Sequence, residues 1–166
     1  MSEFPTGKQR LMTALYIERE DEILLLYRVG SRVVAPSWCG IGGHFEQDEI
    51  SDARVCVLRE LEEETQIRRD DLVNLRLNYI TLRLKNGEVR HNYYFFASLR
   101  DGFEPALMCN EGQLAWMKRA DIPALAMPHT AKAVLLHYLQ TAPQNTRLYG
   151  GIATPSGVIF TPLDEF

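Results

Sequence analysis

Short runs of hydrophobic and β-branched residues, separated by turn-forming residues, predict several β-hairpins along the chain. The predicted pairs of strands are 11–18 with 22–29, 72–85 with 89–99, and the two arms of 148–163. The second pair is joined at Asn86-Gly87, a dipeptide that readily takes the positive φ angles of a tight turn. The third pair is expected to turn at Pro155-Ser156-Gly157.

Helical spacing of apolar residues predicts two helices between these strands. One begins at a cap formed by Ser51 or Asp52 and continues to about Thr65, and the other covers 130–139. The remaining predictions are a short strand that starts at Trp38 and enters a Gly-rich turn, a strand over 113–118, and a short helical turn over 120–125. The expected fold is an α+β sandwich in which helices cover the faces of a mixed, mostly antiparallel sheet.

Length and composition are those of one globular domain, which we expect to cover 1–166. No apolar run approaches the roughly 20 residues that a membrane-spanning helix needs, so no membrane partner is expected. The first ten residues lack a secretory signal, and the three cysteines are too few and too scattered to form a disulfide framework. A cytoplasmic location is therefore expected.

The charge balance argues against a polymeric nucleic acid as the partner. The formal net charge is −4, and no basic cluster stands out that would attract a phosphate backbone. Small molecules are the expected ligands. The oligomeric state, including a homodimer, is left open by the sequence.

The predicted helix that ends near Thr65 carries an unusual concentration of acidic residues. Offsets of three and four bring Glu60, Glu63 and Glu64 onto one face, whereas Glu62 points elsewhere. The adjoining apolar face, which should bury the helix, consists of Val57, Leu58 and Leu61. Clustered carboxylates repel one another unless a cation lies between them, and oxygen ligands suit Mg²⁺ or Mn²⁺. A solvated acidic face is the alternative.

Residues near this helix favour the metal site over a solvated face. Gly42 and Gly43 follow an apolar strand, where glycine lets the backbone approach a ligand closely. Arg59 directly precedes Glu60 and can hold the carboxylates in register through charge-assisted hydrogen bonds.

The segment R-E-L-E-E-E-T-Q-I, residues 59–67, resembles the second half of the Nudix (MutT-like) signature GX5EX7REUXEEXGU, in which U is aliphatic. Gly43 and Glu49 resemble its first half, and the likeness covers roughly 11–139. Nine residues separate Glu49 from Arg59 in place of the family's seven. We place the two additional residues before the helix, which leaves the role of Glu49 open. Gln66 replaces the family's glycine, so the helix is expected to end without a left-handed cap.

The resemblance implies a Nudix fold and the hydrolysis of a nucleoside diphosphate linked to a group X, with Mg²⁺ or Mn²⁺ as the cofactor. It implies that Arg59 orients the glutamates and that either Glu64 or Glu111 is the general base. The implied metal ligands are the Gly42 carbonyl, Glu60, Glu63 and Glu64. The candidate substrate contacts are Arg28, Trp38 and Tyr93, and alternation sends Tyr93 and Tyr94 to opposite faces of their strand.

Three further interpretations concern the substrate and the class of function. An oxidised nucleoside triphosphate such as 8-oxo-dGTP, cleaved to a monophosphate and pyrophosphate, is the first expectation for the substrate. ADP-ribose and nucleotide sugars are the alternatives. A catalytically silent nucleotide-binding regulatory module is the second class of function, although every acid of the REUXEE pattern is present. Messenger decapping is the third, and the acidic charge balance disfavours it.

Overall fold

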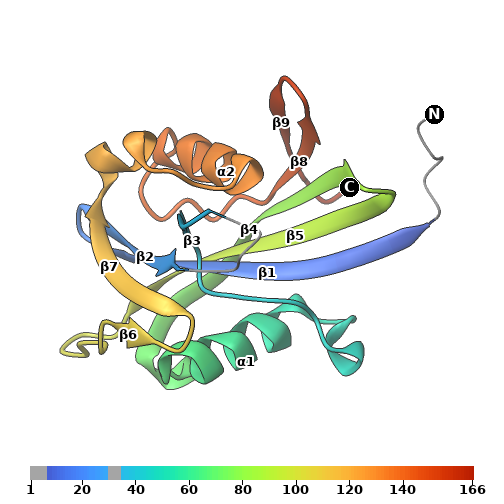
Figure 1. Cartoon of the computed structure of the whole chain (residues 1–166). Coiled ribbons are helices and arrows are strands. Elements are labelled where there is room, and N and C mark those ends of the chain that lie inside the picture. Colours follow the sequence, from blue (N-terminus) through green and yellow to red (C-terminus); the bar gives the residue numbers. More distant parts are fainter. Residues whose placement is uncertain (1–6, 30–34) are drawn as a thin grey trace.

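The computed structural model describes residues 7–29 and 35–166, which form one nine-stranded sheet with a helix on each face (Figure 1). The strands are β1 (Lys8–Arg19), β2 (Glu22–Arg28), β3 (Ser37–Cys39), β4 (Leu72–Lys85), β5 (Glu88–Leu99), β6 (Met108–Cys109), β7 (Gly112–Lys118), β8 (Tyr149–Thr154) and β9 (Gly157–Pro162). The helices are α1 (Ala53–Thr65) and α2 (His129–Leu139). Three short 3₁₀ turns are η1 (Gln47–Glu49), η2 (Arg69–Asp71) and η3 (Arg119–Ala124). The predicted hairpins and helices are therefore confirmed.

The sheet is mixed, in the order β6-β7-β2-β1-β5-β4-β8-β9, with β3 paired to β2. The β1/β5 and β4/β8 pairs are parallel, and the remaining pairs are antiparallel. The two-residue turn at Asn86-Gly87 has positive φ at both positions and fixes the register of β4 against β5. The prediction of an α+β fold with a mixed, mostly antiparallel sheet is confirmed.

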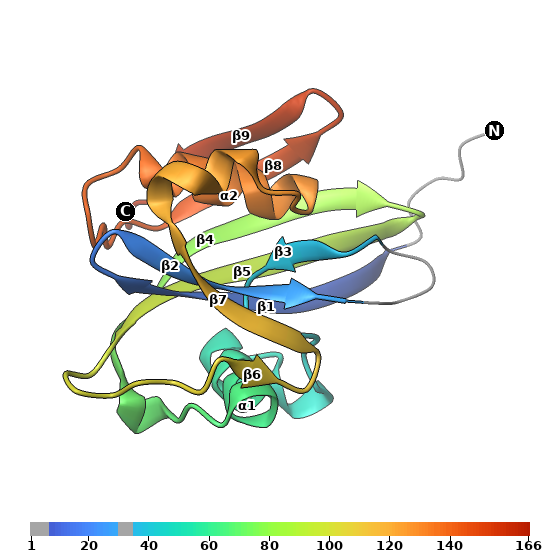
Figure 2. The same ribbon diagram turned by 60° about the vertical axis from the view of Figure 1, so that its left-hand side comes forward.

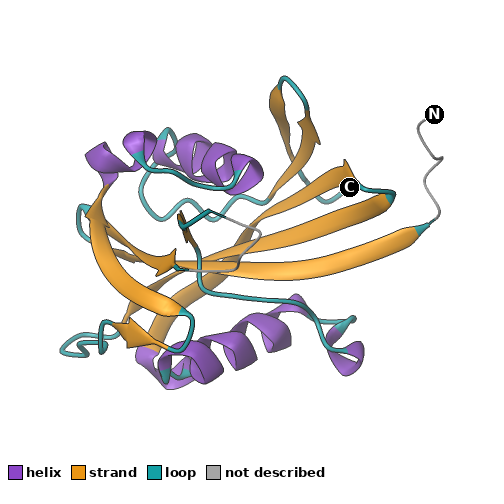
Figure 3. Ribbon diagram, in the orientation of Figure 1, coloured by secondary structure: helices purple, strands orange, loops and turns teal. Residues whose placement is uncertain are grey.

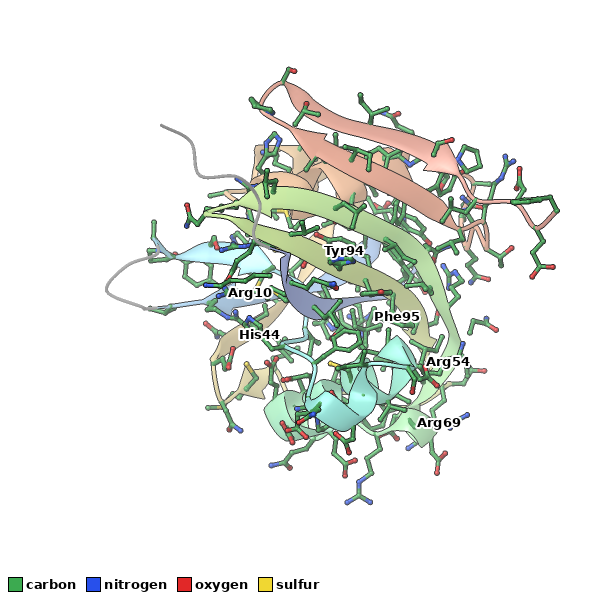
Figure 4. All side chains as sticks on the ribbon, turned by 90° about the vertical axis from the view of Figure 1, so that its right-hand side faces the viewer. Arg10, His44, Arg54, Arg69, Tyr94 and Phe95 are labelled. Atoms are coloured by element: carbon green, nitrogen blue, oxygen red, sulfur yellow. The ribbon has the colours of Figure 1, made fainter. Side chains whose placement is uncertain are left out.

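Alternating side chains divide the sheet into two apolar layers, one under each helix (Figure 3). Val57 and Leu61 of α1 are fully buried against one face, together with Phe95 of β5. Val134 of α2 packs on the other face, where Tyr94 lies. Tyr94 and Phe95 thus leave neighbouring positions of β5 toward opposite faces (Figure 4). Because each helix covers only part of its face, polar side chains occupy the rest.

The two ends of α1 show how its sequence places it. Asp52 is the N-cap, and its carboxylate accepts a hydrogen bond from the Arg54 amide at 2.9 Å. At the other end, Gln66 has a φ of 64°, and its amide donates to the Glu62 carbonyl. The expectation of an ending without a left-handed cap is therefore wrong: glutamine adopts the conformation that glycine would take. Hydrogen bonds around the end of the helix stabilise this conformation at Gln66.

Within the residues that the structure describes, no helix is long and apolar enough to cross a membrane. Cys39, Cys56 and Cys109 are all free thiols, as the scattered cysteine pattern predicts.

Candidate active site

The acidic face of α1 is graded from solvent to interior. The side chain of Glu63 is 58% exposed, that of Glu60 15% and that of Glu64 only 6%. Glu62 points away and forms an exposed ion pair with Arg68, as the helical spacing predicts. The three glutamates therefore differ in solvation although they share one face.

Arg59 holds part of this face together. Its guanidinium donates to Glu60 and Glu63, both at 3.0 Å, and to two oxygens of Glu49 at 2.5 and 3.0 Å. The predicted orienting contact is present, and it includes a third carboxylate. The hydrogen bonds from Arg59 lower the pKa of Glu49 to about 2, and the Glu46 amide adds a further bond at 2.9 Å.

The structure shows the position of Glu49, which the spacing of the motif left open. The turn η1 returns the chain toward α1, and residues 50–52 complete the approach before the helix begins at Ala53. The two additional residues lie before the helix, as expected, and they leave the acidic face intact. Glu49 is 3% exposed and is bound by Arg59. It therefore stabilises the arginine from the side opposite Glu60.

The Gly42-Gly43 segment runs antiparallel to β1, in place of the predicted turn, and passes directly beside the glutamates. A Cβ on Gly43 would lie 2.5 Å from Oε1 of Glu60, and one on Gly42 would lie 2.1 Å from the Thr13 carbonyl oxygen. A side chain at Gly42 would clash with the backbone of β1, and one at Gly43 would require the Glu60 carboxylate to move. The two glycines thus bring backbone amide and carbonyl groups next to Glu60 and Glu64.

Glu64 is a buried carboxyl whose charge is poorly balanced. Its Oε2 is inaccessible to solvent and has no hydrogen-bond partner among the described residues. Burial raises its pKa to about 8, and the neighbouring Glu111 carboxylate adds to the rise, whereas Arg28 opposes it. Nη2 of Arg28 lies 4.0 Å from Oε1 of Glu64. An oxygen atom in this state is suited to bind a cation or a proton.

Glu111, in the loop between β6 and β7, belongs to the same cluster of charged side chains. Nη2 of Arg28 lies 2.6 Å from its Oε2. The preceding Asn110 binds the end of α1, where its side-chain amide donates to the Glu63 carbonyl at 3.0 Å. Gly112 follows and faces Arg28 across the β2/β7 pair, where a Cβ would lie 2.0 Å from the Tyr27 carbonyl oxygen. Figure 2 shows β6, which leads into this loop, beside α1.

The donor groups fit a hard divalent cation. They are carboxylate oxygens of Glu60, Glu63 and Glu64 together with the Gly42 carbonyl, and the buried Oε2 of Glu64 has no other partner in the described part of the chain. Among residues 7–29 and 35–166, no three acidic, histidine or cysteine side chains converge on one point, and Arg59 binds two of the candidate ligands, Glu60 and Glu63. The site thus has the right donors, and an arginine holds two of them.

A cavity of about 240 Å³ opens beside this cluster, on the face of the sheet that α2 covers. Gly42 and Arg28 line it at the end nearest Glu64. The residues along the rest of its wall include Tyr16, Arg83, Arg90, Asn92, Tyr94 and Thr130. It therefore extends from the acidic cluster along the sheet.

The predicted substrate contacts are distributed over both faces. Arg28 lines the cavity, whereas Trp38 packs on Tyr27 with ring centroids 4.9 Å apart. Tyr93 packs on Phe45 at 5.4 Å, on the α1 side, and its neighbour Tyr94 lines the cavity. The alternation of the pair is confirmed, and the tyrosine that faces the cavity is Tyr94.

Sequence reasoning missed Arg83, Arg90 and Asn92, which β4 and β5 bring to the cavity. The two-residue turn at Asn86-Gly87 fixes the register of the hairpin and sets Arg83 opposite Arg90, so this pair could have been predicted from the sequence. The parallel pairing of β1 with β5, which adds Met12 and Tyr16, has no local signal because its partners are far apart in the chain.

Comparison with known proteins identifies the family. A family model described as the NUDIX domain matches residues 8–138, so the chain belongs to the Nudix family and is a Nudix hydrolase. No curated protein gives a significant sequence match.

Solved structures agree with the family in fold. A MutT protein from Bacillus halodurans is 24% identical with a TM-score of 0.62, and the match covers 93% of this chain and 95% of that one. A MutT NUDIX hydrolase from Burkholderia pseudomallei is 24% identical with a TM-score of 0.62, over 78% and 98% of the two chains. A NUDIX hydrolase from Nitrosomonas europaea is 18% identical with a TM-score of 0.65, over 92% and 81%. At these identities the likeness concerns the fold.

Proposed function

We propose that the protein is a metal-dependent pyrophosphohydrolase that cleaves a nucleoside diphosphate linked to a group X. The observation that carries the proposal is the buried carboxyl of Glu64, with an unpartnered oxygen, next to Gly42 and Arg28, which both line a cavity. A buried carboxylate whose charge is incompletely balanced is unfavourable unless a further cation or a proton binds it. A cavity next to such a group provides a place for the substrate whose phosphates the cation would contact.

In this proposal Glu60, Glu63, Glu64 and the Gly42 carbonyl hold Mg²⁺ or Mn²⁺. The bound ion supplies neutralisation of phosphate charge and activation of a water molecule. Arg59 orients Glu60 and Glu63 through its two hydrogen bonds at 3.0 Å. Arg28 points its guanidinium between Glu64 and Glu111, where it can bind a phosphate oxygen and bring it to the site.

Glu111 is the stronger candidate for the general base. Its side chain is 48% exposed, so water reaches it, and its Oε2 lies 2.6 Å from Nη2 of Arg28 beside the proposed metal ligands. Glu64 is 6% exposed, and its raised pKa favours the protonated form until a cation binds. Glu64 therefore fits the role of a metal ligand better than that of a base.

The proposal is tested with a substrate panel and identification of the products. Purified protein with Mg²⁺ is incubated with 8-oxo-dGTP, ordinary nucleoside triphosphates, ADP-ribose and nucleotide sugars. We expect release of a nucleoside monophosphate from at least one of them. Glu64→Gln should lower kcat/KM by at least about 100-fold, whereas Glu62→Gln, on the same helix but outside the cluster, should retain it. Tight nucleotide binding with no hydrolysis would instead support a regulatory module.

Oxidised nucleoside triphosphates remain the first substrates to test, because MutT proteins are among the structural neighbours, and ADP-ribose and nucleotide sugars come next. A small nucleotide as the partner, a single domain over 1–166 and a cytoplasmic location stay predictions.

A further inference from the structure

The cavity beside Glu64 contains several buried polar atoms that the fold does not satisfy. Four of the residues that line it carry a side-chain N or O atom that is inaccessible to solvent and has no hydrogen-bond partner in the described residues. These atoms are the Tyr16 hydroxyl, the Asn92 Oδ1, the Arg90 Nε and the Thr130 Oγ1. The Tyr16 and Thr130 side chains are nearly completely buried, at 0% and 4% exposure. Because buried polar groups are normally paired, four unpaired polar atoms among the residues that line one cavity favour a polar ligand there.

The far end of the cavity is basic. Arg83 of β4 lies opposite Arg90 of β5, and Arg90 in turn lies opposite Arg10 of β1. Like charges directly opposite each other on neighbouring strands are destabilising. One carboxylate, Glu88, lies 3.4 Å from Arg10 and 3.6 Å from Arg90, and no ion pair involves Arg83 within the described part of the chain. The row therefore keeps an excess of positive charge.

The two ends of the cavity are separated by a distance that a nucleotide can span. Gly42 lies against β1 at Ala14, since a Cβ on Gly42 would come 3.0 Å from the Ala14 Cα. Arg10 and its partner Arg90 are four residues further along the strand, which corresponds to about 13 Å between Cα atoms. The backbone of the basic row is thus well separated from Gly42, which leaves room between them for the middle of a substrate. Gly42, Asn92, Arg83 and Arg90 nevertheless line one continuous cavity.

We propose that Arg83 and Arg90 form a second anion site, and that the preferred substrate carries, besides its pyrophosphate, a separate phosphate or carboxylate group. This inference rests on the proposed function, because the first anion is the pyrophosphate at Glu64. The Asn92, Tyr16 and Thr130 groups between the two ends would bind the polar part of the substrate that connects the two anions. An oxidised nucleoside triphosphate has no anionic group at its base end, so a substrate with two separated anions fits the cavity better.

Matched pairs of substrates test this inference and distinguish a phosphate from a carboxylate as the second anion. NADPH and NADH differ by one phosphate, and UDP-glucuronate and UDP-glucose differ by a carboxylate in place of a hydroxymethyl group. We expect kcat/KM to be about tenfold or more higher for at least one substrate with the additional anionic group than for its partner without it. The pair that shows the larger ratio identifies the anion as phosphate or carboxylate. Equal rates within both pairs would overturn the inference.

Substitutions test whether Arg83 and Arg90 cause the preference for the substrate with the additional anion. Arg83→Met and Arg90→Met remove the charge with little loss of length, and each should reduce the ratio to about twofold or less. Arg83→Lys should retain part of the ratio, because a lysine keeps the charge without the planar donor fork. Arg68→Met, at an exposed arginine on the far side of α1, is the matched control and should leave the ratio unchanged. A wild-type ratio in Arg83→Met and Arg90→Met would refute the assignment.

A binding measurement keeps the inference independent of turnover. Adenosine 2′,5′-bisphosphate and AMP differ by one phosphate and can be titrated into the protein without metal. Tighter binding of the bisphosphate, lost in Arg83→Met, supports the second anion site even if no substrate in the panel is hydrolysed. If substrates without the additional anion are hydrolysed as well as those with it, and AMP binds as tightly as the bisphosphate, the hydrolase proposal stands and the second anion site is wrong.

Discussion

Glu49 and Glu64, the two buried carboxyls that frame α1, have opposite electrostatic environments. Glu49 is 3% exposed and Glu64 6%, so the extent of burial does not distinguish them. Arg59 lowers the pKa of Glu49 to about 2, whereas burial raises the pKa of Glu64 to about 8. The difference lies in the partners: Glu49 has two hydrogen bonds from a guanidinium, and Glu64 has an oxygen without any. Glu49 is therefore fully paired and stabilises the fold, whereas Glu64 keeps an oxygen that is free to bind a cation.

Removal of Arg59 should have the largest effect on stability. Arg59→Met leaves Glu49 buried without its counter-charge, and breaking a buried pair from one side typically costs 3–5 kcal/mol. We expect the free energy of unfolding to fall by about 3 kcal/mol, measured by urea denaturation. Arg68→Met removes an exposed arginine whose pair is with Glu62, and it should change stability by less than about 0.5 kcal/mol. Equal effects of the two substitutions would show that the Arg59 contacts do not stabilise the fold.

The two carboxyls should give opposite dependences of stability on pH. For Glu64 the native pKa of about 8 lies above the ordinary value of 4.5, so the native state retains a proton that the unfolded state loses. Stability without metal should therefore fall as pH rises from 4.5 to 8. Glu64→Gln removes this loss and should stabilise the metal-free protein near pH 8 by about 2 kcal/mol, less than the full shift because solvent screens the cluster.

For Glu49 the native pKa of about 2 lies below 4.5, so ionisation favours the native state. This contribution is present above pH 4.5 and is lost as pH falls toward 2. Glu49→Gln should remove that part of the acid sensitivity and lower stability by a constant amount between pH 4.5 and 8, so the pH dependence within that window is unchanged. Thermal melting of both variants from pH 3 to 8 checks the comparison. It fails if Glu64→Gln is destabilising at pH 8 without metal.

Gly43→Ala should disturb Glu60 with a smaller effect. The added Cβ would lie 2.5 Å from the Glu60 carboxylate, which is the end of a flexible side chain and can move. We expect kcat/KM to fall by about tenfold, while the free energy of unfolding changes by less than about 1 kcal/mol. Gly150→Ala is the control, because its Cβ would meet Leu163 at an ordinary 3.5 Å. Unchanged turnover in Gly43→Ala would show that Glu60 does not need its present position.

Local patterns were sufficient to predict much of the site. Helical spacing places Glu60, Glu63 and Glu64 on one face and Glu62 on another, and the glycines beside them follow from the strand before the helix. These features depend on residues close together in the sequence. The Glu49 contact was not predictable from the spacing, since the path of η1 and residues 50–52 decides whether Glu49 reaches Arg59.

The cavity was the least predictable part. The hairpin turn sets Arg83 opposite Arg90, but only the parallel pairing of β1 with β5 brings Tyr16, and the packing of α2 brings Thr130, to the same space. Such contacts join residues far apart in the chain, and neither propensity nor periodicity specifies them. The prediction for Gln66 was wrong for another reason. The surroundings of the helix end impose the left-handed conformation on Gln66 and override the preference of glutamine for other backbone conformations.

The release of protons on metal binding tests the role of Glu64 most directly. At pH 7 a carboxyl with a pKa of about 8 is mostly protonated, so a cation that binds its ionised form must displace the proton. Calorimetric titration of Mn²⁺ in two buffers of different ionisation enthalpy measures the number of protons released per bound ion. We predict release of about 0.9 proton per bound ion at pH 7 in the wild type and in Glu62→Gln, with weak binding and no release in Glu64→Gln. Mn²⁺ binding that is equally tight in Glu64→Gln, or that releases no proton in the wild type, would contradict the assignment of Glu64 as the metal ligand.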